Sequence, residues 1–309
     1  MQLTTTSTFR ITGAEGEYIS GDLHLPGPHA VDAPVGAATS GGRVPLVIVM
    51  HGFKGFKDWG PWAPLCDRFC DNGIAALRFN LSHNGVGLDG EDYSALDKFE
   101  RNTIAAELFD LHEVIDRVRT EQIIPPDRID LDRIFLLGHS RGGAGVLLSA
   151  NEDGASAGRA PGGLAGIITW AAISTYERGW AVEAIEIWER GESVPVLNSR
   201  TKQMMPLGPE LYQDYQAHKS RYDIEVATRS LGRSGIPLLV VHGTEDQTVP
   251  CAEATEVCRW YEAGGGSEVE LVEIIGGDHT LGSRHPFDGW PDALETAFDR
   301  SLKFIQARI

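Results

Sequence analysis

One serine in the chain has the sequence surroundings of a nucleophile. Ser140 is the middle residue of Gly-His-Ser-Arg-Gly at 138–142, between an apolar run typical of a strand and an Ala- and Leu-rich run typical of a helix. A serine at such a sharp strand-to-helix turn has strained backbone angles, so small residues are needed two positions before and after it. Gly138 and Gly142 occupy these positions. We therefore expect the Ser140 hydroxyl to stand clear of a sheet, where it can attack a carbonyl carbon.

A serine hydroxyl needs a base to become nucleophilic, and the base needs an acid that fixes its tautomer. Ligands gather at the carboxyl ends of parallel strands, so both partners are sought just after strand-like runs. His279 follows the last such run and a pair of glycines, and Asp246 follows the run before it. The chain order Ser140, Asp246, His279 is that of one fold class, with acid and base in the last two strand-end loops. We predict these three residues as the catalytic group.

Other histidines and carboxylates near strand ends are interpreted as structural or solvated. A histidine that precedes a glycine in a strand-to-loop turn suits a structural hydrogen bond, and side chains adjacent in sequence to a catalytic residue diverge from it. The residues set aside on these grounds are His51, His139, His242 and Asp278, and Glu245 is set aside in favour of Asp246 as a solvated carboxylate.

Attack on a carbonyl creates an oxyanion, which needs preorganised N–H donors. The backbone N–H of Arg141, directly after the nucleophile, is one candidate donor. The N–H of Phe53, in the His-Gly-Phe loop after the strand at 45–50, is the other. Lys54 and Arg141 are candidates to meet a substrate carboxylate, with solvated charges as the alternative. Tryptophans are expected to shape the substrate pocket beside Lys54: Trp59, Trp62, Trp180 and Trp188.

Composition places the chain among globular proteins and excludes some partners. The 309 residues are 42% hydrophobic and 23% charged, with a formal net charge of -17. A nucleic-acid binder needs a basic face, so neither nucleic acid nor an anionic membrane is an expected partner. The amino terminus has no leader-like pattern, and the longest apolar run, 164–173, is too short to span a bilayer. A cytoplasmic location is the expectation.

Two further patterns bear on metal or cofactor binding. The four cysteines form pairs at 66/70 and 251/258, each spaced as on one helix face, and neither pair makes a Cys-x-x-Cys signature. The stretch 85–90 matches Gly-x-Gly-x-x-Gly, but a polar, non-periodic segment follows it where a dinucleotide site needs a helix. We expect no metal and no cofactor.

Strand-like and helix-like runs alternate along most of the chain, which predicts a mostly parallel sheet. An antiparallel hairpin is expected at 8–25 and a surface connector at 26–42. A long helix is expected over 104–118, with Asp97 and Glu100 capping its start. The alternation breaks at 174–235, which divides the chain into a first core part (1–173), an insertion (174–235) and a second core part (236–309).

The insertion is rich in aromatic residues and charges, as a lid over a pocket would be. Helical pieces are expected near 181–190 and 209–230, with a hairpin turning around 199–202 between them. The alternative is an accessory packing element that never touches substrate, because aromatics at helical spacing are usually core.

Taken together, these motifs resemble the α/β-hydrolase superfamily from about residue 18 to the end. The segment 51–58, His-Gly-Phe-Lys-Gly-Phe-Lys-Asp, resembles the bacterial cinnamoyl (feruloyl) esterase and dienelactone hydrolase-like branch, which is also similar to oligopeptidase catalytic domains. The resemblance implies an eight-stranded sheet with helices on both faces, a lid after the sixth strand, and hydrolysis of a small-molecule carboxylic ester. The sequence departs at 80–85, where Asn-Leu-Ser-His-Asn-Gly replaces the usual Asp-x-Arg-Gly-His-Gly.

Two rival functions remain open at this point. One is a serine peptidase of the oligopeptidase type, although only about 40 residues precede the first core strand, too few for a propeller. The other is a binding protein that keeps the fold without the chemistry, which the complete set of nucleophile, base, acid and elbow glycines opposes. The sequence does not indicate an oligomeric state.

Overall fold

The computed structural model describes residues 4–27, 42–87, 92–155, 163–198 and 201–309. The predicted connector at 26–42 lies almost wholly outside these residues, as do positions 88–90 of the Gly-x-Gly-x-x-Gly match.

In the described part of the chain, eight strands form one sheet in the order β1-β2-β4-β3-β5-β6-β9-β10. The strands are β1 (Thr4–Thr12), β2 (Tyr18–Pro26), β3 (Val44–Met50), β4 (Ala75–Asn80), β5 (Ile129–His139), β6 (Leu164–Trp170), β9 (Leu238–Gly243) and β10 (Val269–Ile274). The pairs β1–β2 and β2–β4 are antiparallel, and all other neighbours are parallel. This confirms the opening hairpin and the mostly parallel, eight-stranded sheet. Every residue of β3, β4 and β9 is buried, because helices cover both faces.

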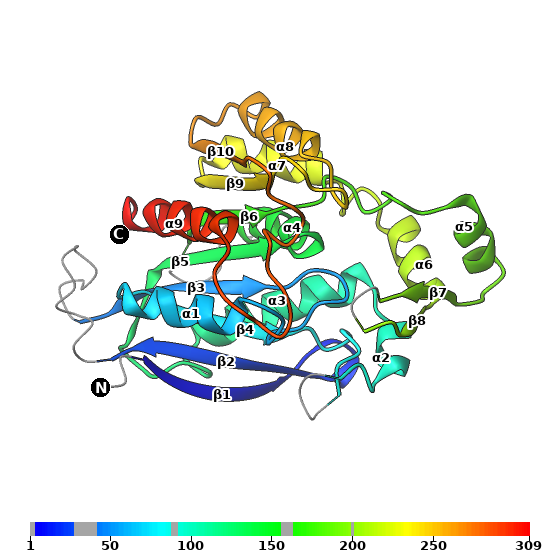
Figure 1. The fold of residues 1–309 in the computed structure, drawn as a ribbon, viewed down its shortest axis with the longest axis horizontal. Coiled ribbons are helices and arrows are strands. Elements are labelled where there is room, and N and C mark those ends of the chain that lie inside the picture. The colour runs from blue at the N-terminus through cyan, green and yellow to red at the C-terminus, as the bar shows by residue number, and fades with distance from the viewer. Residues whose placement is uncertain (1–3, 28–41, 88–91, 156–162, 199–200) are drawn as a thin grey trace.

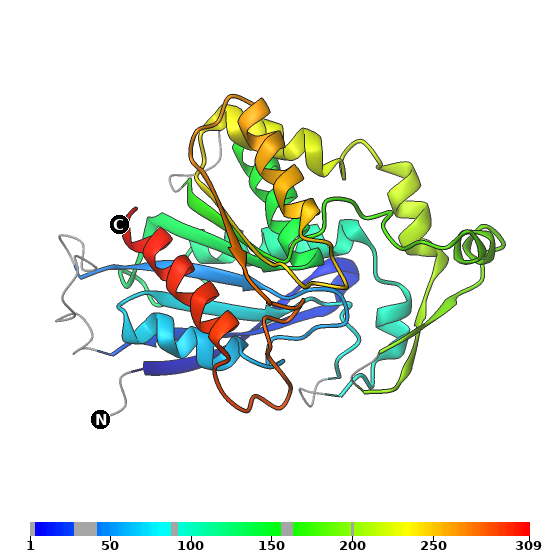
Figure 2. The same ribbon diagram turned by 45° about the horizontal axis from the view of Figure 1, so that its top comes forward.

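Helices cover both faces of the sheet, as expected (Figures 1 and 2). On one face lie α1 (Trp62–Asp71) and α9 (Asp292–Gln306), joined by the rings of Phe69 and Phe298, whose centroids are 5.0 Å apart. On the other face lie α3 (Ile104–Arg119), α4 (Arg141–Ala155), α7 (Ile224–Ser234) and α8 (Ala252–Ala263). Each of these helices buries one side that is mostly apolar, and α7 does so against α4 and α8 rather than against the strands.

The predicted cap of the long helix is wrong. Asp97 and Glu100 belong to a separate short helix, α2 (Leu96–Glu100), and Thr103 caps α3 by accepting the Ala106 N–H at 3.0 Å. Thr103 has extended backbone angles directly before the first helical residue, which is the position that a capping side chain must occupy. Glu100 instead accepts the Gly208 N–H with its carbonyl at 2.8 Å, so it ties α2 to the insertion.

An arm formed by residues 174–217 leaves the core after β6, the sixth strand. It contains α5 (Val182–Glu189), the antiparallel hairpin β7 (Val194–Leu197) and β8 (Met204–Leu207), and α6 (Pro209–Ala217). Figures 1 and 2 show the arm projecting beyond the ends of the sheet strands. The hairpin was expected, and residues 199–200 of its turn lie outside the described residues. The single helix expected near 209–230 is two helices, of which α7 packs against α4 and α8.

Among the described residues, no helix combines the length and the apolar character that crossing a membrane would require. The division of the chain at 174 and 235 stays a prediction.

Candidate active site

Ser140 occupies the sharp turn that the sequence predicted. Strand β5 ends at His139 and helix α4 begins at Arg141, so Ser140 alone makes the turn, with φ at 57° in the left-handed region. A Cβ atom on Gly138 would lie 2.2 Å from the Gly142 carbonyl oxygen, and one on Gly142 would lie 2.5 Å from the carbonyl oxygen of His51. The two glycines therefore allow the backbone to pack closely enough for the turn.

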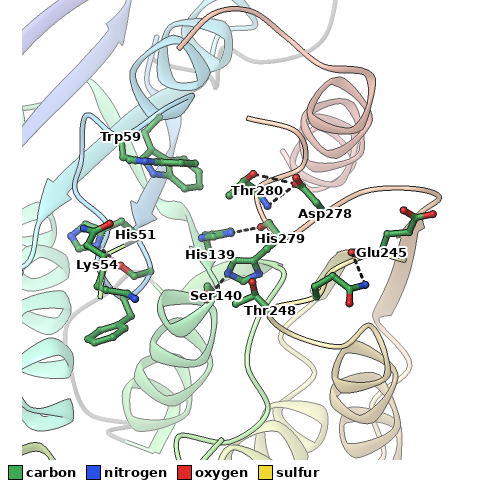
Figure 3. A pocket seen from close by; sticks show the side chains of 16 residues that line it. His51, Lys54, Trp59, His139, Ser140, Glu245, Thr248, Asp278, His279 and Thr280 are labelled. Atoms are coloured by element: carbon green, nitrogen blue, oxygen red, sulfur yellow. Dashed lines mark hydrogen bonds between the residues drawn. The ribbon is translucent and has the colours of Figure 1, made fainter. Parts of the chain in front are cut away.

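The structure brings the three predicted catalytic residues together. His279 lies in the loop after β10, with Nε2 3.1 Å from Ser140 Oγ and Nδ1 2.8 Å from Asp246 Oδ2. Figure 3 shows the His279 ring beside Ser140. Asp246 lies in the loop after β9, the strand next to β10 in the sheet. Nδ1 of the imidazole donates to the carboxylate, which leaves Nε2 free to accept the serine proton.

Asp246 is held as a carboxylate by several donors. Its Oδ1 accepts the N–H groups of Thr248 and Val249 at 2.7 and 2.8 Å. Its Oδ2 accepts from His279 and lies 3.3 Å from Nε2 of His242, which donates to the Val249 carbonyl at 2.8 Å. Burial alone would raise the pKa of Asp246, but hydrogen bonds from His242, His279 and the Val249 N–H hold it well below its usual value. The acid therefore stays ionised beside the base.

The two other strand-end histidines hold the backbone around the site. His139 donates from Nε2 to the carbonyl of His279 at 2.8 Å, so it fixes the loop that carries the base. His51 donates from Nδ1 to the Gly52 carbonyl at 2.9 Å and accepts the Leu81 N–H at Nε2, at 3.3 Å. These roles agree with the structural interpretation of both histidines.

Asp278 and Glu245, the two carboxylates not predicted to be catalytic, lie outside the series of hydrogen bonds that joins Asp246, His279 and Ser140. Oδ1 of Asp278 accepts the N–H groups of Thr280 and Gly282 at 2.9 and 2.8 Å, so it ties its own loop, as expected. Glu245 is exposed, and Figure 3 shows it lying away from Ser140.

The predicted oxyanion donors lie beside Ser140. Phe53 is in the loop after β3, and Arg141 is the first residue of α4, whose N-terminus is the positive end of the helix dipole. Both residues line a cavity that also contains Ser140. Within the described ranges, neither backbone N–H donates to an acceptor in the protein. Both N–H groups are thus available to a substrate oxygen.

Two cavities meet at Ser140 and Phe53, which line both. The larger one, about 430 Å³, is the more polar of the two and is called the polar cavity here: it is lined mostly by core loops, with charged and amide side chains that include Lys54, Glu245 and Gln247. The smaller one, about 320 Å³, is an apolar cavity walled largely by the arm. Its apolar lining includes Ile173, Trp180, Trp188, Val196 and Leu211.

All five residues predicted for the substrate pocket line one of these cavities. Lys54, Trp59 and Trp62 line the polar cavity, whereas Trp180 and Trp188 line the apolar one. Sequence reasoning treated them as one pocket, because nothing in the spacing of the tryptophans shows that Ser140 would separate them. In the part of the chain that the structure describes, no group of three His, Cys, Asp or Glu side chains is placed to hold a metal ion.

Comparison with known proteins agrees with this fold. Residues 46–292 match the model of the alpha/beta hydrolase family, and the chain belongs to that family. No curated protein sequence matches the chain.

Solved structures with the same fold share little sequence with the chain. Est1E from Butyrivibrio proteoclasticus, solved with ferulic acid bound, is 18% identical over 97% of this chain and 98% of its own, with a TM-score of 0.64. A putative dienelactone hydrolase from Klebsiella pneumoniae is 15% identical over 98% of both chains, with a TM-score of 0.58. A puromycin-hydrolyzing peptidase from Mycobacterium tuberculosis is 16% identical over 99% of this chain but only 40% of its own, with a TM-score of 0.65.

Proposed function

We propose that the protein is a serine hydrolase that cleaves carboxylic esters through an acyl-enzyme on Ser140. The observation that carries this proposal is the hydrogen-bonded series from Ser140 Oγ to His279 to Asp246, at 3.1 and 2.8 Å. A serine with a left-handed φ, an imidazole in the accepting tautomer and an ionised acid are the parts that acyl transfer needs.

The geometry supports a two-step reaction. His279 Nε2 takes the proton of Ser140 as Oγ attacks the ester carbonyl, and the resulting oxyanion accepts the N–H groups of Phe53 and Arg141. The tetrahedral intermediate collapses, and the leaving alcohol takes the proton from His279. A water molecule, deprotonated by the same imidazole, then attacks the acyl-enzyme; the acid leaves and Ser140 Oγ takes the proton back from His279.

The two cavities suggest how an ester is divided between them. The apolar cavity fits an apolar or aromatic acyl group, and the polar cavity fits the leaving alcohol. The fold shared with Est1E, which was solved with ferulic acid, favours an acyl group of the cinnamoyl type. The net charge of -17 disfavours polyanionic substrates.

This proposal is tested by measuring kcat/KM for a panel of nitrophenyl esters, which runs from acetate to long acyl chains and includes one cinnamoyl-type ester. A blocked peptide nitroanilide is assayed beside them. We expect kcat/KM for the favoured apolar acyl group to exceed that for acetate by about 10- to 100-fold, because each buried methylene contributes roughly 1 to 3 kcal/mol. Faster cleavage of the peptide would instead favour the peptidase alternative. Absence of both turnover and labelling by a fluorophosphonate would favour a binding protein.

The acyl cavity can be tested separately by filling it. Ala184 on α5 lines the apolar cavity, and Ala184→Trp should lower kcat/KM for the aromatic ester by about 10- to 100-fold while leaving acetate almost unchanged. Glu183→Trp adds the same ring to the same helix at an exposed residue that lines neither cavity, so it serves as the control. Equal losses on both esters would show that the acyl group lies elsewhere.

A further inference from the structure

The side chain of Arg141 forms a buried ion pair behind the oxyanion donors. Its Nε donates to Glu107 Oε2 at 2.9 Å, and the side chains of Arg141 and Glu107 are 10% and 5% exposed. Glu107 lies on α3, and its other oxygen accepts the Asn102 side-chain amide at 2.7 Å. Because both carboxylate oxygens are engaged, the position of the guanidinium is fixed relative to α3.

The guanidinium also lies between two aromatic rings. Its Cζ is 5.3 Å from the ring centroid of Phe53 and 5.3 Å from that of Tyr176. Nη2 is buried and has no hydrogen-bond acceptor among the described residues, an arrangement that the negative faces of two rings compensate electrostatically. The Phe53 ring is held on a further side by Phe99 of α2, with centroids 5.4 Å apart. The Phe53 ring is thus held in place by its contacts with Arg141 and Phe99.

These contacts place one residue behind both oxyanion donors. The backbone N–H of Arg141 is one donor, and its side chain packs on the ring of Phe53, whose N–H is the other. Rate enhancement by such donors depends on holding them within about 0.5 Å of the productive geometry. A loop residue such as Phe53 needs an external support to meet that requirement, and Arg141 provides a rigid, planar one.

We propose that Glu107, through Arg141, is a positioning residue that sets the spacing of the two oxyanion donors. Glu107 touches no reacting atom in this scheme. It anchors the guanidinium, the guanidinium anchors the Phe53 ring, and the ring orients the Phe53 N–H. This inference rests on the proposed function, since it assigns the two N–H groups to the oxyanion of acyl transfer.

The structure offers a matched control for removing this ion pair. Arg119 of α3 and Asp153 of α4 join the same two helices with two hydrogen bonds, at 2.6 and 2.8 Å, and their side chains are 6% and 11% exposed. Arg119 and Asp153 line neither cavity at Ser140. Replacing a buried ion pair by apolar residues of similar size is often tolerated, so both double variants are designed to fold.

The experiment uses two double variants, each compared with wild type. One carries both Glu107→Met and Arg141→Met, and the control carries both Arg119→Met and Asp153→Leu. The readouts are the rate constant for labelling Ser140 with a fluorophosphonate, whose P=O group occupies the oxyanion site, and kcat and KM for a nitrophenyl ester. We expect the first variant to label about 10- to 100-fold more slowly and to lose kcat by the same factor, with KM nearly unchanged. The control pair should stay within about twofold of wild type.

Phe53→Leu provides a second test that keeps the ion pair and the backbone N–H but removes the ring face. It should slow labelling in the same direction by a smaller factor. If the Glu107→Met/Arg141→Met variant and the Phe53→Leu variant are both folded by circular dichroism and label at the wild-type rate, the proposal is overturned. A wild type that labels but cleaves no ester overturns the esterase function while the labelling rates still decide the role of Glu107. A wild type that is never labelled overturns both.

Discussion

Replacing Ser140 by alanine should lower kcat for the favoured ester by about ten-thousand- to a million-fold, because the nucleophile, base and acid act as a unit. The remaining activity would come from water attacking an ester bound near the oxyanion donors. KM should change little, since the hydroxyl contributes to bond formation more than to ground-state binding. Steady-state hydrolysis of the nitrophenyl ester and loss of fluorophosphonate labelling measure the effect.

Ser149→Ala is the matched control for this prediction. Ser149 lies on the same helix, is fully buried, and its hydroxyl has no hydrogen-bond partner among the described residues. Its replacement should leave kcat within about twofold, because only a small unpaired group is lost. Comparable losses in the two variants would mean that Ser140 is not the nucleophile.

Asp246→Asn should lower kcat by about ten-thousand-fold, because it favours the wrong tautomer of the base. The amide oxygen would still accept the hydrogen bonds from the Thr248 and Val249 N–H groups. The NH₂ group would then face His279 Nδ1. Nδ1 would then have to accept, so Nε2 would carry the proton and could no longer take one from Ser140. Asp278→Asn, in the loop of His279, is the control and should cost less than about tenfold.

We expect the Asp246→Asn substitution to lower the unfolding free energy by an amount that depends on pH. Because the pKa of Asp246 is depressed in the folded protein, its carboxylate stabilises the native state above the unfolded-state pKa of about 3.9. That contribution disappears as pH falls through the lower, folded-state pKa. The difference in unfolding free energy between wild type and Asp246→Asn should therefore have its largest value near pH 7 and decrease below about pH 4. Urea denaturation between pH 3 and pH 7 measures it, and a difference that grows toward low pH would contradict the assignment.

The meeting of Ser140, Asp246 and His279 could be predicted from the sequence because each residue has a local signal. The glycines around Ser140 are required by a backbone that leaves no room for a Cβ, and Asp246 and His279 follow the two strands that end beside it. The parallel sheet brings such strand ends to one edge whatever the connecting sequence. Local chemistry and one topological rule were therefore sufficient to place these residues.

The supporting contacts could not be predicted in this way. Glu107 is a charged residue buried on a helix whose apolar stripe alone was readable, and its partner is 34 positions away. Nothing near either residue indicates the pairing. The prediction of the α3 cap failed for a related reason. Asp97 and Glu100 are residue types that cap helices, but they lie in the separate helix α2, and Thr103 is the residue directly before α3.

The two cavities at Ser140 are built by different parts of the chain, and this affects how specificity can evolve. The wall of the apolar cavity comes largely from the arm, whereas the polar cavity is formed mostly by loops at the strand ends that also carry the catalytic group. Under the proposed function, recognition of the acid is therefore separable from recognition of the alcohol. Substitutions in the arm away from Tyr176, whose ring lies against the Arg141 guanidinium, can diversify the acyl preference with little effect on the catalytic loops, while changes in the polar cavity risk the reaction itself. Acyl selectivity is thus the trait that descendants of this chain can alter most freely.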